Sequence, residues 1–343
     1  MMRRAVVICP GRGTYNKAEL GYLARHHGGQ ADLIAGFDAQ RIAAGRAPVS
    51  KLDSAARFVT SDYARGDVAS ALIYACAAAD AGALAQDIEI VAVTGNSMGW
   101  YIALAVGRAL SAPEGFRLTD TMGTLMHDNL IGGQIVYPCW GEDWVPDPAR
   151  KAALLAQLSE IGAAQGQTLD LSIDLGGMIV VAGDEAGLRA FEAAVPSIGG
   201  RFPMRLPQHA GFHTKLQSPV AAQGRAALSD LSMHQPACPL IDGRGHVWWP
   251  GAQGTGALFD YTLGHQVTET YDFAAAIRSA AREFAPDLFI ITGPGTTLGG
   301  AVAQSLIACE WRGLGSKADF EAAQEAGPLV VAMGREDQRA LVL

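Results

Sequence analysis

The sequence predicts an α/β fold in which a parallel sheet forms an α/β-hydrolase-like core and a small ferredoxin-like α+β subdomain is inserted. Two apolar runs, residues 5–9 and 88–93, are each followed by a glycine-bearing turn and then by a helical pattern. This order is typical of parallel strands joined by crossover helices. A third apolar run, residues 288–291, leads into a similar glycine-containing loop. Residues 131–206 follow a different pattern, which predicts the inserted subdomain.

The core elements follow from local patterns. The first run ends in the turn 10–13 (P-G-R-G) and the second in the turn 94–97 (T-G-N-S). Residues 53–85 are alanine-rich with apolar residues at helical spacing, and residues 98–110 predict a helix that begins at the second turn. Open α/β sheets place their sites at the carboxyl ends of strands, so we expect the loops after the three runs to form one site.

The inserted segment contains both strand and helix patterns. The expected strands are 134–137, 177–182 and 202–206, and the expected helices are 148–162 and 184–194. This β-α-β-β-α-β-like order is that of a ferredoxin-like subdomain. We therefore place the core at residues 1–130 and 207–343 and the insertion at residues 131–206.

Composition and charge exclude several classes of function. Of the 343 residues, 49% are hydrophobic and 17% are charged, which is typical of a globular protein. The net charge of −8 disfavours nucleic-acid binding, which needs concentrated Lys and Arg. No apolar run approaches the roughly 18 residues of a membrane helix, and the first run is too short for a signal peptide. We expect a cytoplasmic protein that binds neither nucleic acid nor membrane.

Metal and cofactor motifs are also missing from the sequence. The five cysteines are widely separated and lack CxxC spacing, which predicts reduced, buried thiols and neither disulfides nor a zinc site. The first turn, residues 10–13, lacks the third glycine of a nicotinamide-binding fingerprint, and the chain contains no phosphate loop. We therefore expect no metal and no permanently bound cofactor.

The central chemical signal is the G-x-S-x-G pattern at residues 95–99, which contains Ser97. A serine hydroxyl is a weak nucleophile, so it needs a tight turn that exposes Oγ, a neighbouring base and backbone N–H groups for an oxyanion. The pattern follows a predicted strand and precedes a predicted helix, which is the context such a nucleophile requires. A plain glycine-serine turn is the alternative.

Two of the eight histidines, His209 and His213, lie just after the closing strand of the insertion and are the candidates for the base. The local sequence barely separates them. No aspartate or glutamate between Ser97 and these histidines stands out as a carboxylate partner, so a backbone carbonyl is expected to orient the imidazole.

The chain resembles the malonyl-CoA:acyl carrier protein transacylases and the acyltransferase domains of fatty-acid and polyketide synthases. Those proteins carry PGQGSQ near the start, GHSLGEY at the nucleophile, NSPGQVVIAG in the insertion, a histidine after P-S or A-F, QL-x2-PV-x-W, and GPG near the end. This sequence has, in the same order, 10–15 (P-G-R-G-T-Y), 95–101 (G-N-S-M-G-W-Y), 175–183 (L-G-G-M-I-V-V-A-G), 210–213 (A-G-F-H), 266–273 (Q-V-T-E-T-Y-D-F) and 293–295 (G-P-G).

The resemblance implies a role for each matching residue. Ser97 matches the nucleophile and His213 the catalytic histidine, which leaves His209 in the loop or the pocket wall. Gln266 matches the residue whose main-chain carbonyl orients that histidine. The backbone N–H groups of Arg12 and Met98 match the two donors of the oxyanion hole.

The resemblance also implies an acyl pocket in which this sequence departs from the family. Met122 stands where malonyl-specific members have an arginine, and a methionine cannot pair with a carboxylate. A dicarboxylic acyl group is therefore disfavoured unless another cation, of which Arg12 is the candidate, takes that place. Trp100, Phe212 and Asn96 are the other expected pocket residues. Trp100 and Met122 fit an apolar pocket wall and the core equally well.

The function that the resemblance implies is transfer of an acyl group from acyl-CoA to the phosphopantetheine thiol of an acyl carrier protein, through an acyl-serine, with altered acyl specificity. The expected partners are acyl-CoA and the carrier protein, and the expected state is a monomer. Basic residues near the insertion, Arg201, Arg205 and Lys215, are candidates for contact with an acidic carrier. The alternatives are an editing thioesterase that gives the acyl group to water and a catalytically silent docking subunit.

Overall fold

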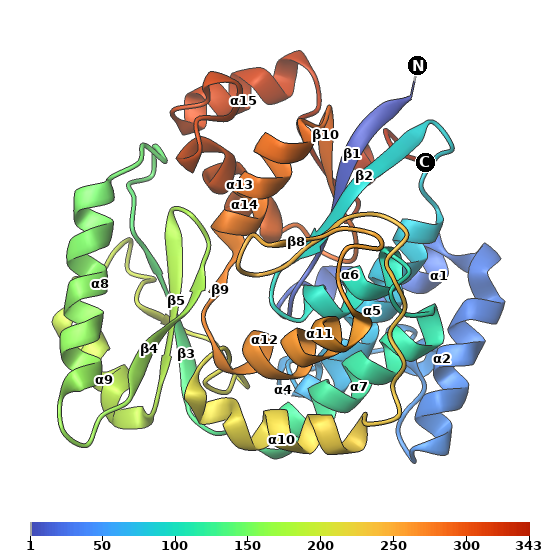
Figure 1. Ribbon diagram of the computed structural model, residues 1–343, viewed down its shortest axis with the longest axis horizontal. Coiled ribbons are helices and arrows are strands. Elements are labelled where there is room, and N and C mark those ends of the chain that lie inside the picture. The colour runs from blue at the N-terminus through green and yellow to red at the C-terminus, as the bar shows by residue number, and fades with distance from the viewer. Residues whose placement is uncertain (1) are drawn as a thin grey trace.

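The structure, a computed structural model, describes residues 2–343 and contains two sheets (Figure 1). The first sheet orders its strands β11-β10-β1-β2-β7-β8. Neighbouring strands are parallel from β11 to β7, and β8 adds antiparallel at the edge. The strands are β1 (Arg3–Cys9), β2 (Ile88–Gly95), β7 (Leu240–Ile241), β8 (Val247–Trp248), β10 (Leu288–Ile291) and β11 (Val330–Ala332).

Both faces of this sheet are covered, which explains why its central strands are continuous apolar runs. Val7 pairs with Ile290 on one side and with Val93 on the other, and all three are fully buried. Figure 1 shows α5, α6 and α7 on one side of the sheet and α13 and α14 on the other. This arrangement agrees with right-handed crossovers that leave β1 in opposite directions along the sheet.

The helices of the core differ widely in length. They are α1 (Tyr22–His26), α2 (Ala31–Ala43), α3 (Val49–Asp53), α4 (Thr60–Tyr63), α5 (Gly66–Gly82), α6 (Gly99–Val106), α7 (Ala112–Asp128), α10 (Ser218–Ala227), α11 (Thr255–Asp260), α12 (Gln266–Thr268), α13 (Phe273–Phe284), α14 (Leu298–Ala308), α15 (Lys317–Ala326) and α16 (Glu336–Arg339). Short 3-10 turns occupy Lys17–Glu19, Gly28–Gln30, Lys215–Gln217 and Trp311–Gly313, and a π-helical turn occupies Tyr261–His265. Within residues 2–343, no helix has the length and hydropathy needed to cross a membrane.

The second sheet confirms the inserted ferredoxin-like subdomain. Its elements are β3 (Gly133–Pro138), α8 (Pro148–Ala163), β4 (Leu169–Asp174), β5 (Met178–Gly183), α9 (Glu185–Ala194) and β6 (Met204–Arg205). The strand order β6-β3-β5-β4 is fourth, first, third, second in sequence, with antiparallel neighbours. In Figure 1, α8 and α9 cover the outer face of this sheet, away from the core.

The insertion is attached to the core through a strand that the sequence patterns did not reveal. The core segment β9 (Tyr271–Asp272) pairs in parallel with β4, so it forms an edge of the second sheet. β4 itself was not predicted from the sequence, and the expected closing strand 202–206 shortens to β6. Two-residue strands are too short to show an alternating pattern, and only pairing with a neighbour defines them.

The three glycine-containing loops open at one edge of the first sheet, as the sequence predicted. Cys9 at the end of β1 lies beside Gly95 at the end of β2, and Ile8 pairs with Ile291 at the end of β10. The loops that follow these strands therefore meet above the carboxyl ends of the sheet, where open α/β sheets place their sites.

Candidate active site

Ser97 occupies a tight turn between β2 and α6. Its φ of +57° lies in the left-handed region, which is uncommon for a residue with a side chain. The Gly99 N–H donates to the Asn96 carbonyl and the Trp100 N–H to the Ser97 carbonyl, so the helix begins directly at the turn. A non-glycine residue held in this conformation carries a backbone strain of order 1 kcal/mol, and such residues cluster at functional sites.

The glycines on both sides of Ser97 are required by close backbone contacts. A Cβ atom on Gly95 would overlap the backbone of Gly99, and a Cβ atom on Gly99 would overlap the Cys9 carbonyl oxygen. Both obstacles are main chain, so a side chain cannot turn aside to make room. The G-x-S-x-G pattern is therefore explained by the fit of the turn against β1.

A methyl group at Gly99 is expected to destabilise the protein. Gly99→Ala should lower the free energy of unfolding by at least about 2 kcal/mol, because backbone must shift to admit the new carbon. Gly36→Ala in α2 is the matched control, since no atom lies within 4 Å of a Cβ there. Alanine in a helix interior should raise stability slightly, by about 0.5–1 kcal/mol. Urea unfolding of both variants checks the prediction; equal stabilities would contradict it.

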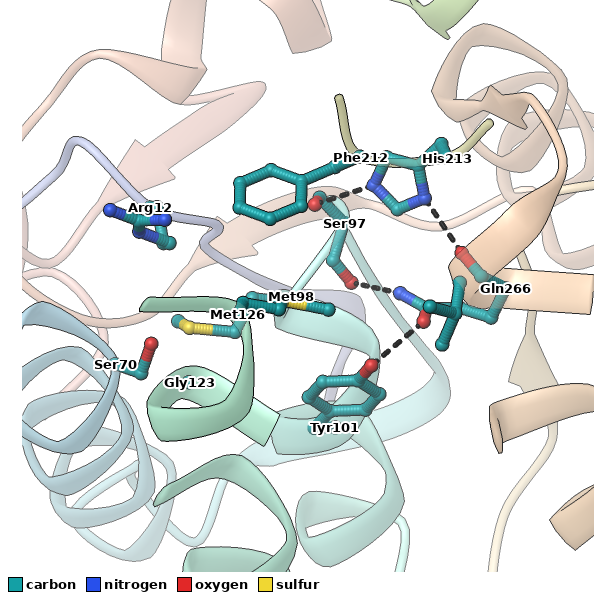
Figure 2. Close-up of a pocket in the computed structure, with 11 residues that line it drawn as sticks. Arg12, Ser70, Ser97, Met98, Tyr101, Gly123, Met126, Phe212, His213 and Gln266 are labelled. Atoms are coloured by element: carbon teal, nitrogen blue, oxygen red, sulfur yellow. Dashed lines mark hydrogen bonds between the residues drawn. The ribbon is translucent and has the colours of Figure 1, made fainter. Parts of the chain in front are cut away.

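The structure brings His213, and not His209, to Ser97. The His213 Nε2 lies 2.7 Å from Ser97 Oγ, and its Nδ1 lies 2.6 Å from the Gln266 carbonyl oxygen (Figure 2). With Nδ1–H donating to that carbonyl, Nε2 is left free to accept the Ser97 proton. His209 instead places its Nδ1 2.8 Å from Gln134 Oε1 in β3.

Gln266 forms hydrogen bonds with both His213 and Ser97. While its carbonyl accepts from His213, its side-chain Nε2 donates to the Ser97 carbonyl oxygen over 3.0 Å. Tyr101, in the first turn of α6, donates its hydroxyl to Gln266 Oε1 over 2.9 Å and so orients the amide (Figure 2). No sequence pattern indicated Tyr101, because an aromatic residue in a buried helix has no distinguishing pattern.

Burial controls the protonation of His213. Removal from water lowers the pKa of the imidazole to about 4, while the hydrogen bond to the Gln266 carbonyl acts in the opposite direction. The ring is therefore neutral at neutral pH, which is the form that can accept a proton. Burial and the nearby Arg12 cation also hold the pKa of His209 well below its usual range.

Two backbone N–H groups beside Ser97 remain open. Within the described chain, neither the Met98 N–H nor the Arg12 N–H finds an intramolecular acceptor. Arg12 follows Gly11, where a Cβ atom would lie 2.6 Å from the Asn96 carbonyl oxygen, so the first loop packs directly against the Ser97 turn. Open N–H groups in adjoining loops can stabilise a negatively charged oxygen.

A cavity opens at Ser97. Its lining includes Arg12, Ser97, Met98, Phe212, His213 and Gln266 from the expected set, together with Ser70, Tyr101, Gly123, Met126 and Val267. Figure 2 shows the Ser97–His213–Gln266 group on one side of the cavity and Arg12, Ser70 and Met126 on the other.

Three residues expected in the acyl pocket do not line this cavity. Trp100 is fully buried, its ring packs against Tyr261, and its Nε1 donates to Thr262. The sulfur of the fully buried Met122 packs against Gly224. Asn96 is also absent from the lining, and its backbone N–H donates to the Cys9 carbonyl oxygen. Trp100 and Met122 are therefore core residues, and the α7 positions that reach the cavity are Gly123 and Met126.

Two of the basic residues expected to meet a carrier protein are already paired. Arg205 bonds to both Glu185 and Glu192, and Lys215 forms an ion pair with Glu269. Arg201 lies over the ring of Phe202. These pairs lower the net positive charge that this surface offers to an acidic partner.

No cluster of three or more His, Cys, Asp or Glu side chains suited to hold a metal ion occurs in residues 2–343.

Solved structures share this fold over nearly the whole chain. A malonyl-CoA:acyl carrier protein transacylase from Xanthomonas oryzae pv. oryzae matches with a TM-score of 0.74 at 20% identity, covering 95% of this chain and 99% of that one. An acyl carrier protein S-malonyltransferase from Vibrio cholerae matches with a TM-score of 0.72 at 19% identity, covering 89% and 94%. The acyltransferase domain of the second salinomycin polyketide synthase module matches with a TM-score of 0.69 at 19% identity, covering 98% and 70%.

These matches confirm, at the level of the fold, the structural resemblance that the sequence motifs indicated. Neither a family model nor a curated protein matches the sequence. The inserted subdomain and the core are therefore shared with proteins that are only 19–20% identical to this one in sequence.

Proposed function

We propose that this protein is an acyltransferase that moves an acyl group from acyl-CoA to the phosphopantetheine thiol of an acyl carrier protein. Ser97 is the nucleophile, His213 the general base, and the Gln266 carbonyl the group that orients His213. The observation that carries the proposal is the hydrogen-bonded series from Ser97 Oγ through His213 to the Gln266 carbonyl, at the mouth of a cavity. The fold shared with acyl-transferring proteins supports it.

In the first half-reaction, Ser97 Oγ attacks the thioester carbon while His213 Nε2 takes the hydroxyl proton. The new C–O bond produces a tetrahedral intermediate, whose oxyanion is stabilised by the N–H groups of Arg12 and Met98. When the C–S bond breaks, His213 returns the proton to the departing sulfur. Free CoA leaves, and an acyl-serine ester remains.

In the second half-reaction, the carrier-protein thiol approaches the acyl-serine from the side that CoA vacated. His213 removes the thiol proton, the sulfur attacks the ester carbon, and the proton passes back to Ser97 Oγ as the C–O bond breaks. The products are an acyl thioester on the carrier and free enzyme. We place this ping-pong reaction in the cytoplasm and expect a monomer to carry it out.

Intact-mass spectrometry after mixing the protein with a panel of acyl-CoAs tests the proposal. We expect a single acyl adduct on Ser97, which disappears when carrier protein bearing phosphopantetheine is added and reappears as acyl-carrier. Release of free acid without acyl-carrier would instead identify a hydrolase. No adduct with any thioester would leave the docking subunit as the function.

The pH dependence of acylation follows from the low pKa of His213. Protonated imidazole cannot take the Ser97 proton, so acylation should be lost as the pH falls through the folded-state pKa of about 4. We expect the rate constant for CoA release to stay nearly constant from pH 8 to about 5 and to fall below it. Stopped-flow detection of free CoA measures the profile, with circular dichroism to verify folding. A midpoint near the ordinary histidine value of about 6.5 would contradict this.

A further inference from the structure

Tyr271 lies beside the Ser97–His213 pair but does not line the cavity. It is fully buried and begins β9, the core strand that pairs with Ile173 of β4. Its hydroxyl donates to the Gly95 carbonyl oxygen over 2.5 Å, two residues before Ser97. Its ring centroid lies 5.3 Å from that of His213. One side chain therefore contacts both the backbone that leads to the candidate nucleophile and the ring of the candidate base.

The peptide between Gly95 and Asn96 is held from both sides. The Asn96 N–H donates to the Cys9 carbonyl oxygen over 3.0 Å, toward β1. In a trans peptide the carbonyl points the opposite way, which here is toward β7 on the other side of β2. The pairing of β2 with β7 ends one residue earlier, at Thr94. The Tyr271 hydroxyl therefore binds the carbonyl at the point where the neighbouring strand has ended.

This peptide depends on such contacts because Gly95 has no side chain to restrict it. The backbone of Gly99 excludes a Cβ atom at Gly95, so the position must be glycine. Glycine has the widest range of backbone angles, so hydrogen bonds set the direction of its carbonyl. Ser97 has a φ of +57°, and a strained conformation of this kind persists only where surrounding contacts hold it. The hydrogen bond at Gly95 is one of those contacts.

The Tyr271 ring is itself fixed, which gives its hydroxyl one position. A Cβ atom on Gly243 would lie 2.5 Å from the ring, so the loop after β7 packs directly against it. The Asp272 N–H donates to the Gly243 carbonyl oxygen over 2.6 Å, which ties β9 to the same loop. Burial raises the pKa of the Tyr271 hydroxyl well above its usual range, so the group stays protonated and can donate at neutral pH.

We propose that Tyr271 is a positioning residue for Ser97: its hydroxyl fixes the peptide after Gly95 and thereby holds Ser97 Oγ in line with His213 Nε2. The inference rests on the proposed function, which makes Ser97 the nucleophile and His213 the base. Alignment matters because the hydroxyl must attack while its proton moves to Nε2, 2.7 Å away. A slightly misplaced nucleophile lowers the reaction rate even where the substrate binds as before.

Tyr271→Phe removes the hydroxyl and keeps the ring. The probe is whichever of acetyl-CoA, butyryl-CoA and malonyl-CoA acylates the parent fastest. At saturation, the single-turnover rate constant for CoA release should fall roughly 5- to 10-fold, the effect of losing one buried hydrogen bond. The concentration that gives half the maximal rate should stay within about twofold, because Tyr271 does not line the cavity. An unchanged rate constant, or a change in that concentration alone, would overturn the inference.

Tyr137→Phe is the matched control. Tyr137 lies in β3, is buried, and donates its hydroxyl to the Pro196 carbonyl oxygen over 2.8 Å, within the insertion and outside the cavity lining. Each variant loses one hydroxyl-to-carbonyl hydrogen bond, so both should unfold at a slightly lower temperature in circular dichroism. Only Tyr271→Phe should be slower in acylation. Equal losses of rate in the two variants would indicate general destabilisation and overturn the assignment.

Labelling with diisopropyl fluorophosphate separates this inference from the proposed function. Ser97 Oγ displaces fluoride from phosphorus and His213 takes the hydroxyl proton, so the reaction needs no thioester. Intact-mass spectrometry should show labelling of Tyr271→Phe slowed by roughly 5- to 10-fold as well. Slowed labelling, with no adduct from any thioester on the parent, would support the role of Tyr271 and overturn the transferase. Parental rates of both reactions in Tyr271→Phe would leave the transferase intact and overturn the role of Tyr271. A parent that reacts with neither reagent would overturn both.

Discussion

Replacing Ser97 with alanine is expected to lower the rate of acyl transfer by at least about 1,000-fold and to remove the acyl adduct completely. Alanine keeps the backbone of the turn but has no oxygen with which to form the ester. The Arg12 and Met98 N–H groups would remain, but they cannot stabilise an oxyanion that no longer forms. The measurements are acyl-carrier formation by mass spectrometry and CoA release by absorbance.

The controls for this variant address both the hydroxyl and the turn. Ser54→Ala, at an exposed residue in another turn, should retain the parental rate. Ser97→Gly should be as inactive as Ser97→Ala yet more stable, by about 0.5–1 kcal/mol, because glycine adopts the positive φ without strain. An acyl adduct of full intensity on the alanine variant would show that another residue is the nucleophile.

Replacing His213 with alanine should have an effect of the same order. Without an acceptor 2.7 Å from Ser97 Oγ, the hydroxyl proton has no destination during attack. The expected loss in acylation rate is about 1,000-fold or more, and the Ser97→Ala, His213→Ala double variant should be no slower than either single one. The residues act as one unit, so their losses do not add. Single-turnover release of CoA measures all three rates.

His209 is the decisive comparison for this prediction. It lies four residues before His213 in the same loop and is half-buried, but its ring hydrogen-bonds to Gln134 and not to Ser97. His209→Asn retains a polar group for Gln134, and the acylation rate should stay within about tenfold of the parent. A loss equal to that of His213→Ala would contradict the assignment of the base.

The fold was predictable where the pattern is local. The continuous apolar strands β1, β2 and β10 are readable because burial on both faces removes polar residues from them. The short strands β7, β8 and β9 were not, since two residues cannot establish an alternating pattern. Pairing of β9 with β4 depends on segments about 100 residues apart meeting in space.

The candidate site was predictable in part. The Ser97 turn was readable because main-chain contacts require glycine at both flanks. The residues that line the cavity could not be predicted from the sequence. Adjacent positions on a helix point about 100° apart, so the sequence could not show that Met122 faces the core while Gly123 faces the cavity.

By itself, the sequence determined that this protein has a parallel α/β sheet with an insertion and a tight serine turn at the end of β2. These features depend on residues within a few positions of one another. The local sequence left His209 and His213 open, and only the family resemblance selected His213. The tertiary structure alone decided that Tyr101 orients Gln266 and that Arg12 and Ser70 share a cavity. Hydrogen bonds and unmet donors in a buried site depend on which distant segments the fold brings together, and no local spacing encodes that.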